Sequence, residues 1–324
     1  MGLNKLRALL PGVTAIAGII GLLSLAPAAH AQQQAFAIGN GGTSLITFNT
    51  NAPTAATAVG NFTLNGAAFA LDALDFRPLN GQLYGFRYQT DAGTAISTLY
   101  TVNTNNGILT QVAAGGNAAS TNLLGMDFNP MIDRVRVVTD DADNLVYNPN
   151  SAAAPTVASP LEYAVGDVNF GKAAHVLENA YNNNLAGTGS TTQYVIDYQL
   201  GILATLNNNL GQLTTIGSLG VPINQSAPLV GFDIFTAFSG VNTAYAILDT
   251  TATGAGASLY TINLGTGAAT SVGSVTNAAG GRFGQVYSLA VTPSVAPEPG
   301  SLALLVGAMA VTGVPLYRRR KRSA

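Results

Sequence analysis

Between Gln32 and Thr292 the chain alternates apolar and polar positions with a period of two residues. Segments such as SLITFNT at Ser44, TLYTVNT at Thr98 and SLYTINL at Ser258 place every second side chain on an apolar face, as in half-buried β-strands. Glycine and asparagine, which are typical of tight turns, separate these segments. The pattern predicts an all-β region, with one short helix allowed between Val168 and Asn183.

The strand pattern repeats at intervals of fifty-odd residues. Three clear copies of one element are LDALDFRP, LLGMDFNP and LVGFDIFT, and two weaker copies are HVLENAYNN and VYSLAVTP. Each unit holds about four short strands, which is typical of one antiparallel propeller blade. Aligned on the aspartate of the clear copies, the five elements are spaced by 52, 53, 53 and 57 residues and fall at Asp75, Asp127, Ala180, Asp233 and Ala290.

The two ends of the repeat region complement each other. The first unit begins at Phe36 and lacks its opening strand, whereas Val286–Val291 is an opening strand with no blade after it. Pairing of these segments would complete a fifth blade and remove exposed sheet edges. The sequence therefore predicts a five-bladed β-propeller over residues 32–293, closed by its N- and C-terminal strands. A β-sandwich and an open β-solenoid are the alternatives.

Composition narrows the chemistry of this region. Only 9% of the 324 residues are charged, and the chain has no Cys and no Trp. The absence of cysteine excludes disulfides, thiolate metal sites and cysteine nucleophiles. Between Gln32 and Ala296, six Lys and Arg residues stand against fourteen Asp and Glu, a formal charge of −8. Nucleic acid is therefore not an expected partner, because phosphate binding needs clustered basic residues.

Residues 1–31 have the pattern of a signal peptide. A basic start precedes an apolar run from Ala8 to Leu25, and Ala29-His30-Ala31 has small residues at the two positions that a signal peptidase reads. We expect export across the inner membrane and cleavage by signal peptidase after Ala31. A retained membrane anchor is the alternative.

Residues 294–324 form a second addressing segment. Pro297-Glu298-Pro299 precedes an apolar stretch over residues 301–317 and a basic end, RRRKR, over residues 318–322. Seventeen residues just span a bilayer core as a transmembrane helix, and the basic end is expected to stay in the cytoplasm. The arrangement resembles the PEP-CTERM sorting signal of Gram-negative bacteria.

The resemblance implies that an exosortase removes the tail after a transient, membrane-anchored stage. The expected destination is the cell surface or the extracellular matrix of a bacterium that makes exopolysaccharide. A plain membrane anchor is the alternative. The G-x-D-F-x-P and LYTVNTNNG elements between Phe36 and Val291 resemble a family of secreted bacterial proteins, catalogued as a domain of unknown function, with propeller-like repeats. That resemblance implies no activity and no functional residues.

Three aspartates recur at the repeat position and are candidate site residues. The opening strand of each propeller blade lines the central channel, so Asp75, Asp127 and Asp233 are expected to converge there. Three carboxylates are suited to binding Ca²⁺, or to acting as acid and base on a glycan. The structural alternative is that each aspartate accepts hydrogen bonds from the turn that follows it and fixes blade geometry. The sequence leaves these interpretations open.

Asp140, Asp141 and Asp143 form the densest acidic cluster, between two expected strands. Their spacing resembles part of a calcium loop, but the Gly and the distant Glu of an EF-hand are missing. A solvated hairpin turn and weak Ca²⁺ binding are the two interpretations, and no other cofactor is expected. His175 is the only histidine left after signal cleavage, which excludes a histidine-rich metal site and favours a surface or packing role.

These observations predict a non-catalytic exported protein whose propeller is a binding or scaffold module in an exopolysaccharide-rich envelope. Asn182–Asn184, residues 151–160 and Tyr163 or Tyr181 are the expected sugar contacts, because exposed propeller loops usually form the binding surface. The alternative is a secreted glycan-active hydrolase or lyase that uses the channel carboxylates. The absence of Trp weakens that alternative, since such enzymes need aromatic platforms.

Overall fold

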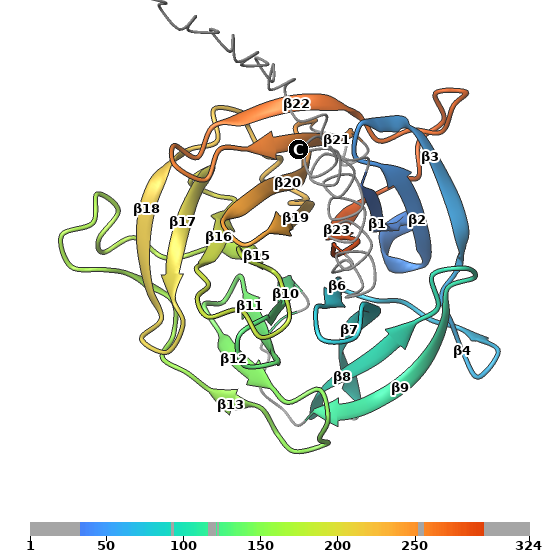
Figure 1. The fold of residues 1–324 in the computed structure, drawn as a ribbon, viewed down its shortest axis with the longest axis horizontal. Coiled ribbons are helices and arrows are strands. Elements are labelled where there is room, and N and C mark those ends of the chain that lie inside the picture. Colours follow the sequence, from blue (N-terminus) through green and yellow to red (C-terminus); the bar gives the residue numbers. More distant parts are fainter. Residues whose placement is uncertain (1–32, 92–93, 116–120, 122, 252–255, 295–324) are drawn as a thin grey trace, which may run out of the picture. The chain divides into compact units, whose positions relative to one another are not determined.

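The repeat region folds into five small β-sheets arranged as a five-bladed β-propeller (Figure 1). The computed structural model describes residues 33–91, 94–115, 121, 123–251 and 256–294. The predicted signal peptide with its cleavage site at Ala31, and the predicted sorting tail from residue 295 onward with Pro297-Glu298-Pro299, lie outside the described residues. In the described part of the chain, no helix is long and apolar enough to cross a membrane.

Each blade is a meander of four antiparallel strands, and its first strand lies nearest the centre in Figure 1. Blade 1 is β23-β1-β2-β3, blade 2 contains β6–β9, blade 3 is β10–β13, blade 4 contains β15–β18 and blade 5 is β19–β22. The innermost strands are β23 (Tyr287–Val291), β6 (Ala73–Arg77), β10 (Leu124–Asn129), β15 (Val176–Tyr181) and β19 (Val230–Phe238).

The outer strands follow in the same order in every blade. The second strands are β1 (Gln34–Gly39), β7 (Gln82–Asp91), β11 (Arg134–Thr139), β16 (Gln193–Asp197) and β20 (Val241–Asp249). The third strands are β2 (Ser44–Asn49), β8 (Thr94–Val102), β12 (Asn144–Tyr147), β17 (Ile202–Asn207) and β21 (Ala257–Ile262). The fourth strands are β3 (Ala52–Asn61), β9 (Ile108–Gly115), β13 (Thr156–Val157), β18 (Gln212–Ser218) and β22 (Ala269–Ser274).

Short additional strands extend two of the blades. β4 (Thr63–Leu64) pairs in parallel with β9 and in antiparallel with β5 (Ala67–Ala68) at the outer edge of blade 2. β14 (Glu162–Tyr163) pairs in parallel with β18 in blade 4. A single 3₁₀ turn, η1 (Asn40–Gly42), joins β1 to β2.

The predicted closure of the ring by its two terminal strands is confirmed. β1 pairs in antiparallel with β23, with Ala35 opposite Val291, and Thr292 N donates to Gln34 O at 2.8 Å. Blade 1 is therefore built from both ends of the domain, so the sheet edge that an open array would expose is covered. The arrangement excludes the β-sandwich and the open solenoid.

The asparagines that end or directly follow the third strands explain how the outer hairpins turn. In four blades, the side-chain oxygen of this asparagine accepts a hydrogen bond from the backbone N–H two residues later, at 2.9–3.0 Å, which closes an Asx turn. The four residues are Asn49, Asn103, Asn148 and Asn263. The helix allowed over Val168–Asn183 does not form, because β15 occupies Val176–Tyr181 and pairs with β16.

The hydrophobic core consists of five apolar layers, one between each pair of neighbouring blades. The layer between blades 3 and 4 is the most polar. Val138 is its one buried apolar residue from the described strands of blade 3, and the buried Arg136 donates across the interface to Asn208 O at 3.0 Å. Polar contacts therefore contribute to this interface alongside apolar burial.

Candidate functional site

The structure brings the three repeated aspartates together near the centre of the ring. Asp75, Asp127 and Asp233 lie at equivalent positions of β6, β10 and β19, and each is only 2% exposed. Burial raises the pKa of all three, and the neighbouring charges add to this: Asp233 raises the pKa of Asp75, and Asp75 and Asp233 both raise that of Asp127. The expected convergence is therefore present, in a buried layer.

The three carboxylates accept hydrogen bonds from one backbone N–H on each of the five innermost strands. These donors all follow the repeat position directly in sequence. The bonds run from Phe76 N to Asp75 Oδ1 (2.7 Å), Phe128 N to Asp75 Oδ2 (2.8 Å), Tyr181 N to Asp127 Oδ2 (2.8 Å), Ile234 N to Asp233 Oδ1 (2.5 Å) and Val291 N to Asp233 Oδ2 (2.5 Å). We call this set the interblade latch, because it joins blade 2 to 3, 3 to 4 and 5 to 1.

One of the six carboxylate oxygens of the latch accepts no backbone N–H. This oxygen, Asp127 Oδ1, is buried beside the carboxyl of Asp75. Two carboxyl groups form a hydrogen bond only when one carries a proton. Burial raises the pKa of Asp75 and Asp127 well above 3.8 and that of Asp233 to about 7. The latch is therefore suited to retaining a proton near neutral pH.

Blades 4 and 1 have alanine at the repeat position and carry their polar group two residues earlier. Glu178 of β15 and Ser288 of β23 are buried and hydrogen-bonded to each other, and Ser288 Oγ accepts from Leu74 N at 2.9 Å. Burial raises the pKa of Glu178 well above 4.5. Sequence reasoning missed both residues, although the exchange of Asp for Ala at Ala180 and Ala290 was a signal that these two blades differ.

The blades with aspartate have a small residue where Glu178 and Ser288 stand. A Cβ on Gly125 would lie 2.5 Å from Glu178 Cα, and one on Gly231 would lie 2.8 Å from Ser288 C. These glycines allow the innermost strands of neighbouring blades to approach closely enough for the aspartate to reach the next strand. The glycine and the aspartate of the G-x-D motif therefore take part in the same contact with the next blade.

This geometry favours a structural role for the repeated aspartates over ion binding or catalysis. Both oxygens of Asp75 and of Asp233 are taken by backbone donors, and no group of three or more Asp, Glu or His side chains in the described part of the chain could hold a metal ion. The structural alternative placed the hydrogen-bond donors in the turn after each aspartate, and this was wrong. They lie on the innermost strands, because unpaired N–H groups of an edge strand point toward the centre.

The acidic cluster forms the turn between β11 and β12. Ala142 has a left-handed backbone with φ of 65°, and Asp143 N donates to Thr139 Oγ1 at 3.0 Å. Asp140 Oδ1 lies 2.8 Å from Nδ1 of His175, so this pair joins blade 3 to blade 4, and Asp141 is exposed. The cluster is therefore divided among a turn, an interblade contact and solvent.

Tyr163 and Tyr181 do not form an exposed sugar-binding surface. Tyr163 is 2% exposed and donates to Asp197 Oδ2 at 2.7 Å, whereas Tyr181 is fully buried and donates to Gln193 Oε1 at 2.9 Å. Both rings fill blade 4, where their hydroxyls satisfy buried acceptors. The expectation of sugar contacts at these two residues was wrong, because a tyrosine that is next to a loop in the sequence can still be buried in the core.

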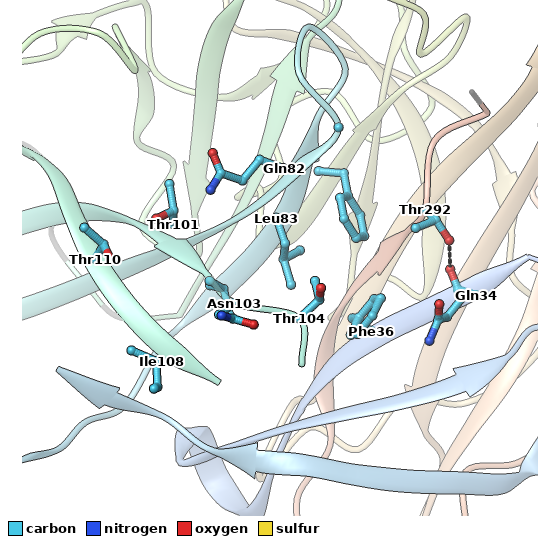
Figure 2. Close-up of a pocket in the computed structure, with 13 residues that line it drawn as sticks. Gln34, Phe36, Gln82, Leu83, Thr101, Asn103, Thr104, Ile108, Thr110 and Thr292 are labelled. Carbon is cyan, nitrogen blue, oxygen red and sulfur yellow. Dashed lines mark hydrogen bonds between the residues drawn. The ribbon is translucent and has the colours of Figure 1, made fainter. Parts of the chain in front are cut away.

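A pocket of about 480 Å³ opens between blades 1 and 2, where strands from both ends of the domain meet (Figure 2). We call it the blade 1–2 pocket. The buried rings of Phe36 and Phe76 meet edge to face in its lining, with centroids 5.7 Å apart. The lining residues are Gln34, Phe36, Phe76, Gly81, Gln82, Leu83, Thr101, Val102, Asn103, Thr104, Ile108, Thr110 and Thr292.

The chemistry of the blade 1–2 pocket is neutral. Its lining combines amides and hydroxyls with apolar side chains and contains no Asp, Glu, Lys, Arg or His. Gln34 Nε2 donates to Thr47 Oγ1 at 3.1 Å, and Thr292 Oγ1 donates to Gln34 O, so one wall is held by the strands that close the ring. Such a surface suits a neutral ligand with many hydroxyl groups.

A second pocket, of about 370 Å³, opens around the starts of the innermost strands. The residue three positions before the repeat position lines it in every blade: Asp72, Leu124, Leu177, Val230 and Tyr287. Asp72 accepts hydrogen bonds from Arg87 Nη1 at 2.9 Å and from Tyr88 N at 2.6 Å. Burial raises the pKa of Asp72 to about 6, against the lowering effect of Arg87. We call this the axial pocket.

The fold and the pockets define a five-bladed β-propeller with a neutral interblade pocket and a buried carboxylate latch. The chain belongs to the family described as Domain of unknown function (DUF4394), whose model matches residues 44–289. No curated protein matches the sequence.

Three solved structures are similar to this chain at low sequence identity. A chain of a nidogen/laminin complex is 10% identical with a TM-score of 0.40, and the match covers 80% of this chain and 98% of that one. A protein from Lactobacillus plantarum is 12% identical with a TM-score of 0.34, covering 80% and 99% of the two chains. An auxiliary nutrient binding protein from Bacteroides thetaiotaomicron is 10% identical with a TM-score of 0.33, covering 74% and 64%.

Proposed function

We propose that this protein is an exported binding module for neutral glycans at the cell surface or in the extracellular matrix of a Gram-negative bacterium. In this proposal a signal peptidase removes residues 1–31, and an exosortase recognises Pro297-Glu298-Pro299 and removes the tail. The propeller then remains in an exopolysaccharide-rich envelope. The observation that carries the binding role is the uncharged, amide- and hydroxyl-lined blade 1–2 pocket.

Three properties of the pocket support a neutral saccharide as its ligand. Its volume of about 480 Å³ falls within the range of small-molecule sites. Its polar groups are amides and hydroxyls, which donate and accept hydrogen bonds in the way that sugar hydroxyls require. The absence of a charged side chain in its lining gives no attraction to a uronic acid, a sulfated sugar or a phosphate.

Glycan-array binding by the full chain tests this proposal. We expect retention on neutral oligosaccharides and a loss of roughly tenfold or more in affinity for Gln82→Ala combined with Thr101→Val, because hydrogen bonds with sugar hydroxyls are removed. Gln111→Ala is the matched control, since Gln111 is exposed on the same blade and does not line the pocket. Equal binding by the double variant and the control, or no binding to any neutral glycan, would overturn the assignment.

A further inference from the structure

The ends of the innermost strands define one face of the propeller. At this face each innermost strand turns into the second strand of its blade, through residues 78–81, 130–133, 182–192 and 239–240. In blade 1 the corresponding position is the gap between Thr292 and Gln34, where the described domain begins and ends. We call this the terminal face, because both ends of the domain leave from it.

The turns on the terminal face carry exposed apolar side chains. Leu79, Met131 and Ile132 meet around a depression of about 280 Å³ that crosses from blade 2 to blade 3. In blade 5, Phe238 and Val241 lie opposite each other at the tip of the β19–β20 hairpin. The exposed fractions are 59% for Leu79, 48% for Met131, 51% for Ile132, 64% for Phe238 and 43% for Val241.

The opposite face has a different character. There the second strand of each blade turns into the third, and the turn of blade 3 carries Asp140, Asp141 and Asp143. Among the described residues of these turns, no large hydrophobic side chain is exposed. Asp133, the one carboxylate beside these apolar tips in the described part of the chain, is paired with Arg77, whereas Leu123, in the connection that leads into β10, is 37% exposed on the opposite face. The cluster of apolar tips gains free energy by leaving water.

The sequence that follows the propeller indicates which surface the terminal face contacts. Among the described residues, Thr292 is the last with a hydrogen bond to the propeller, and the apolar stretch of residues 301–317 begins nine residues later. Nine residues span at most about 30 Å when fully extended. The stretch is followed by RRRKR and is long enough to cross a bilayer core. A membrane holding this stretch would therefore lie within about 30 Å of the point where the chain leaves the terminal face.

We propose that the terminal face rests on a phospholipid bilayer while the C-terminal segment is inserted, with Leu79, Met131, Ile132, Phe238 and Val241 reaching the headgroup region. This inference rests on the membrane-anchored stage of the proposed function and adds an orientation to it. The acidic turn of blade 3 then points away from anionic headgroups, and the apolar tips enter the interface, where such side chains are favoured.

Depth-dependent fluorescence quenching tests the orientation in the full chain. Because the protein has no cysteine, single variants can be labelled with an environment-sensitive fluorophore: Phe238→Cys and Ile132→Cys on the terminal face, and Asp141→Cys on the opposite face. Phe170→Cys is the matched control, since Phe170 is 58% exposed in the connection that packs on the outer strand β18. The labelled chains are reconstituted in phosphatidylethanolamine–phosphatidylglycerol vesicles containing nitroxide lipids.

We expect nitroxide lipids to quench the labels at 238 and 132 roughly twofold or more, because interfacial side chains lie within reach of the headgroups. Labels at 141 and 170 are expected to be quenched mainly by aqueous iodide. If the chain floats with vesicles but nitroxide lipids and iodide quench all four labels to the same extent, the orientation is wrong and the membrane anchoring of the C-terminal segment is retained. If the chain does not float with vesicles, anchoring is wrong and the orientation fails with it. Quenching at 238 and 132 by iodide alone, with dimers in solution, would assign the face to a second copy.

Discussion

In the interblade latch, three aspartates supply hydrogen-bond acceptors to five backbone N–H groups, one on each innermost strand. An N–H group left buried without an acceptor costs about 1–3 kcal/mol. Asp75 and Asp233 each serve their own strand as well as the next, because the blades preceding theirs carry Ala290 and Ala180. Asp75 and Asp233 therefore each accept hydrogen bonds from the innermost strands of two blades.

Replacement of Asp233 tests the latch. Asp233→Ala leaves Ile234 N and Val291 N without their acceptor and is expected to lower the free energy of unfolding by about 2–5 kcal/mol. Asp233→Asn keeps one acceptor oxygen and removes a buried charge, so its loss should be at most half as large. Urea denaturation measures both variants. Similar small losses for the two substitutions would show that the backbone bonds contribute little.

Gly125→Ala tests the close approach of β10 to β15. The added methyl group would meet the backbone of Glu178 at 2.5 Å and Leu177 O at 2.6 Å, so we expect a loss of about 2–3 kcal/mol in urea denaturation. Gly189→Ala is the control, because nothing lies within 4 Å of a Cβ at that position. Equal stability of the two variants would contradict the packing described for the G-x-D motif.

At the scale of the strand, pattern and repeat were sufficient to predict the innermost strands and the closure of the ring. The period-2 alternation and the recurrence of Asp75, Asp127 and Asp233 reflect the geometry of each strand, so both patterns are visible in the sequence. The partner of each carboxylate depends on how neighbouring blades tilt, so the latch was not predictable. The blade 1–2 pocket combines Gln34, Gln82 and Thr292, which belong to no motif.

The pairing of β1 with β23 is testable by engineered cross-linking. Ala35 and Val291 are opposite each other, so Ala35→Cys with Val291→Cys should form a disulfide in a chain that has no other cysteine. Oxidation closes a long loop and is expected to raise Tm by several degrees relative to the reduced form. Ala35→Cys with Leu213→Cys, on β18 of blade 4, is the control. A disulfide in the control alone would contradict ring closure.

The polar layer between blades 3 and 4 makes an element-scale prediction. Arg136 Nε and the side-chain amide of Asn179 are buried without a hydrogen-bond partner among the described residues. Fewer apolar contacts and unsatisfied polar atoms lower the free energy of local opening. In native-state hydrogen exchange, we expect protected amides of β10 and β15 to exchange faster than those of β19 and β23. Uniform exchange across all innermost strands would contradict this expectation.

At the scale of the whole molecule, buried carboxyl groups make stability depend on pH. Burial raises the pKa of Asp72 to about 6 and of Asp233 to about 7, and raises those of Asp75, Asp127 and Glu178 as well. In the unfolded chain these groups titrate near pH 4. Between about pH 4 and 7 the folded protein therefore binds more protons than the unfolded chain, and stability rises as pH falls.

The expected result is a Tm that increases by several degrees from pH 8 to pH 5, measured by scanning calorimetry. Asp233→Asn should reduce this increase, because one of the groups that takes up a proton on folding is removed. Asp141→Asn is the control, since Asp141 is exposed. A Tm that falls steadily from pH 8 to pH 5 would contradict the raised pKa values of the latch.

Calorimetric titration of the full chain with neutral and uronic-acid oligosaccharides, each at low and high salt, tests the proposed function most directly. The uncharged lining of the blade 1–2 pocket predicts binding of the neutral ligand with an affinity that salt leaves unchanged. Binding confined to the acidic oligosaccharide and abolished by salt would contradict a neutral-glycan module.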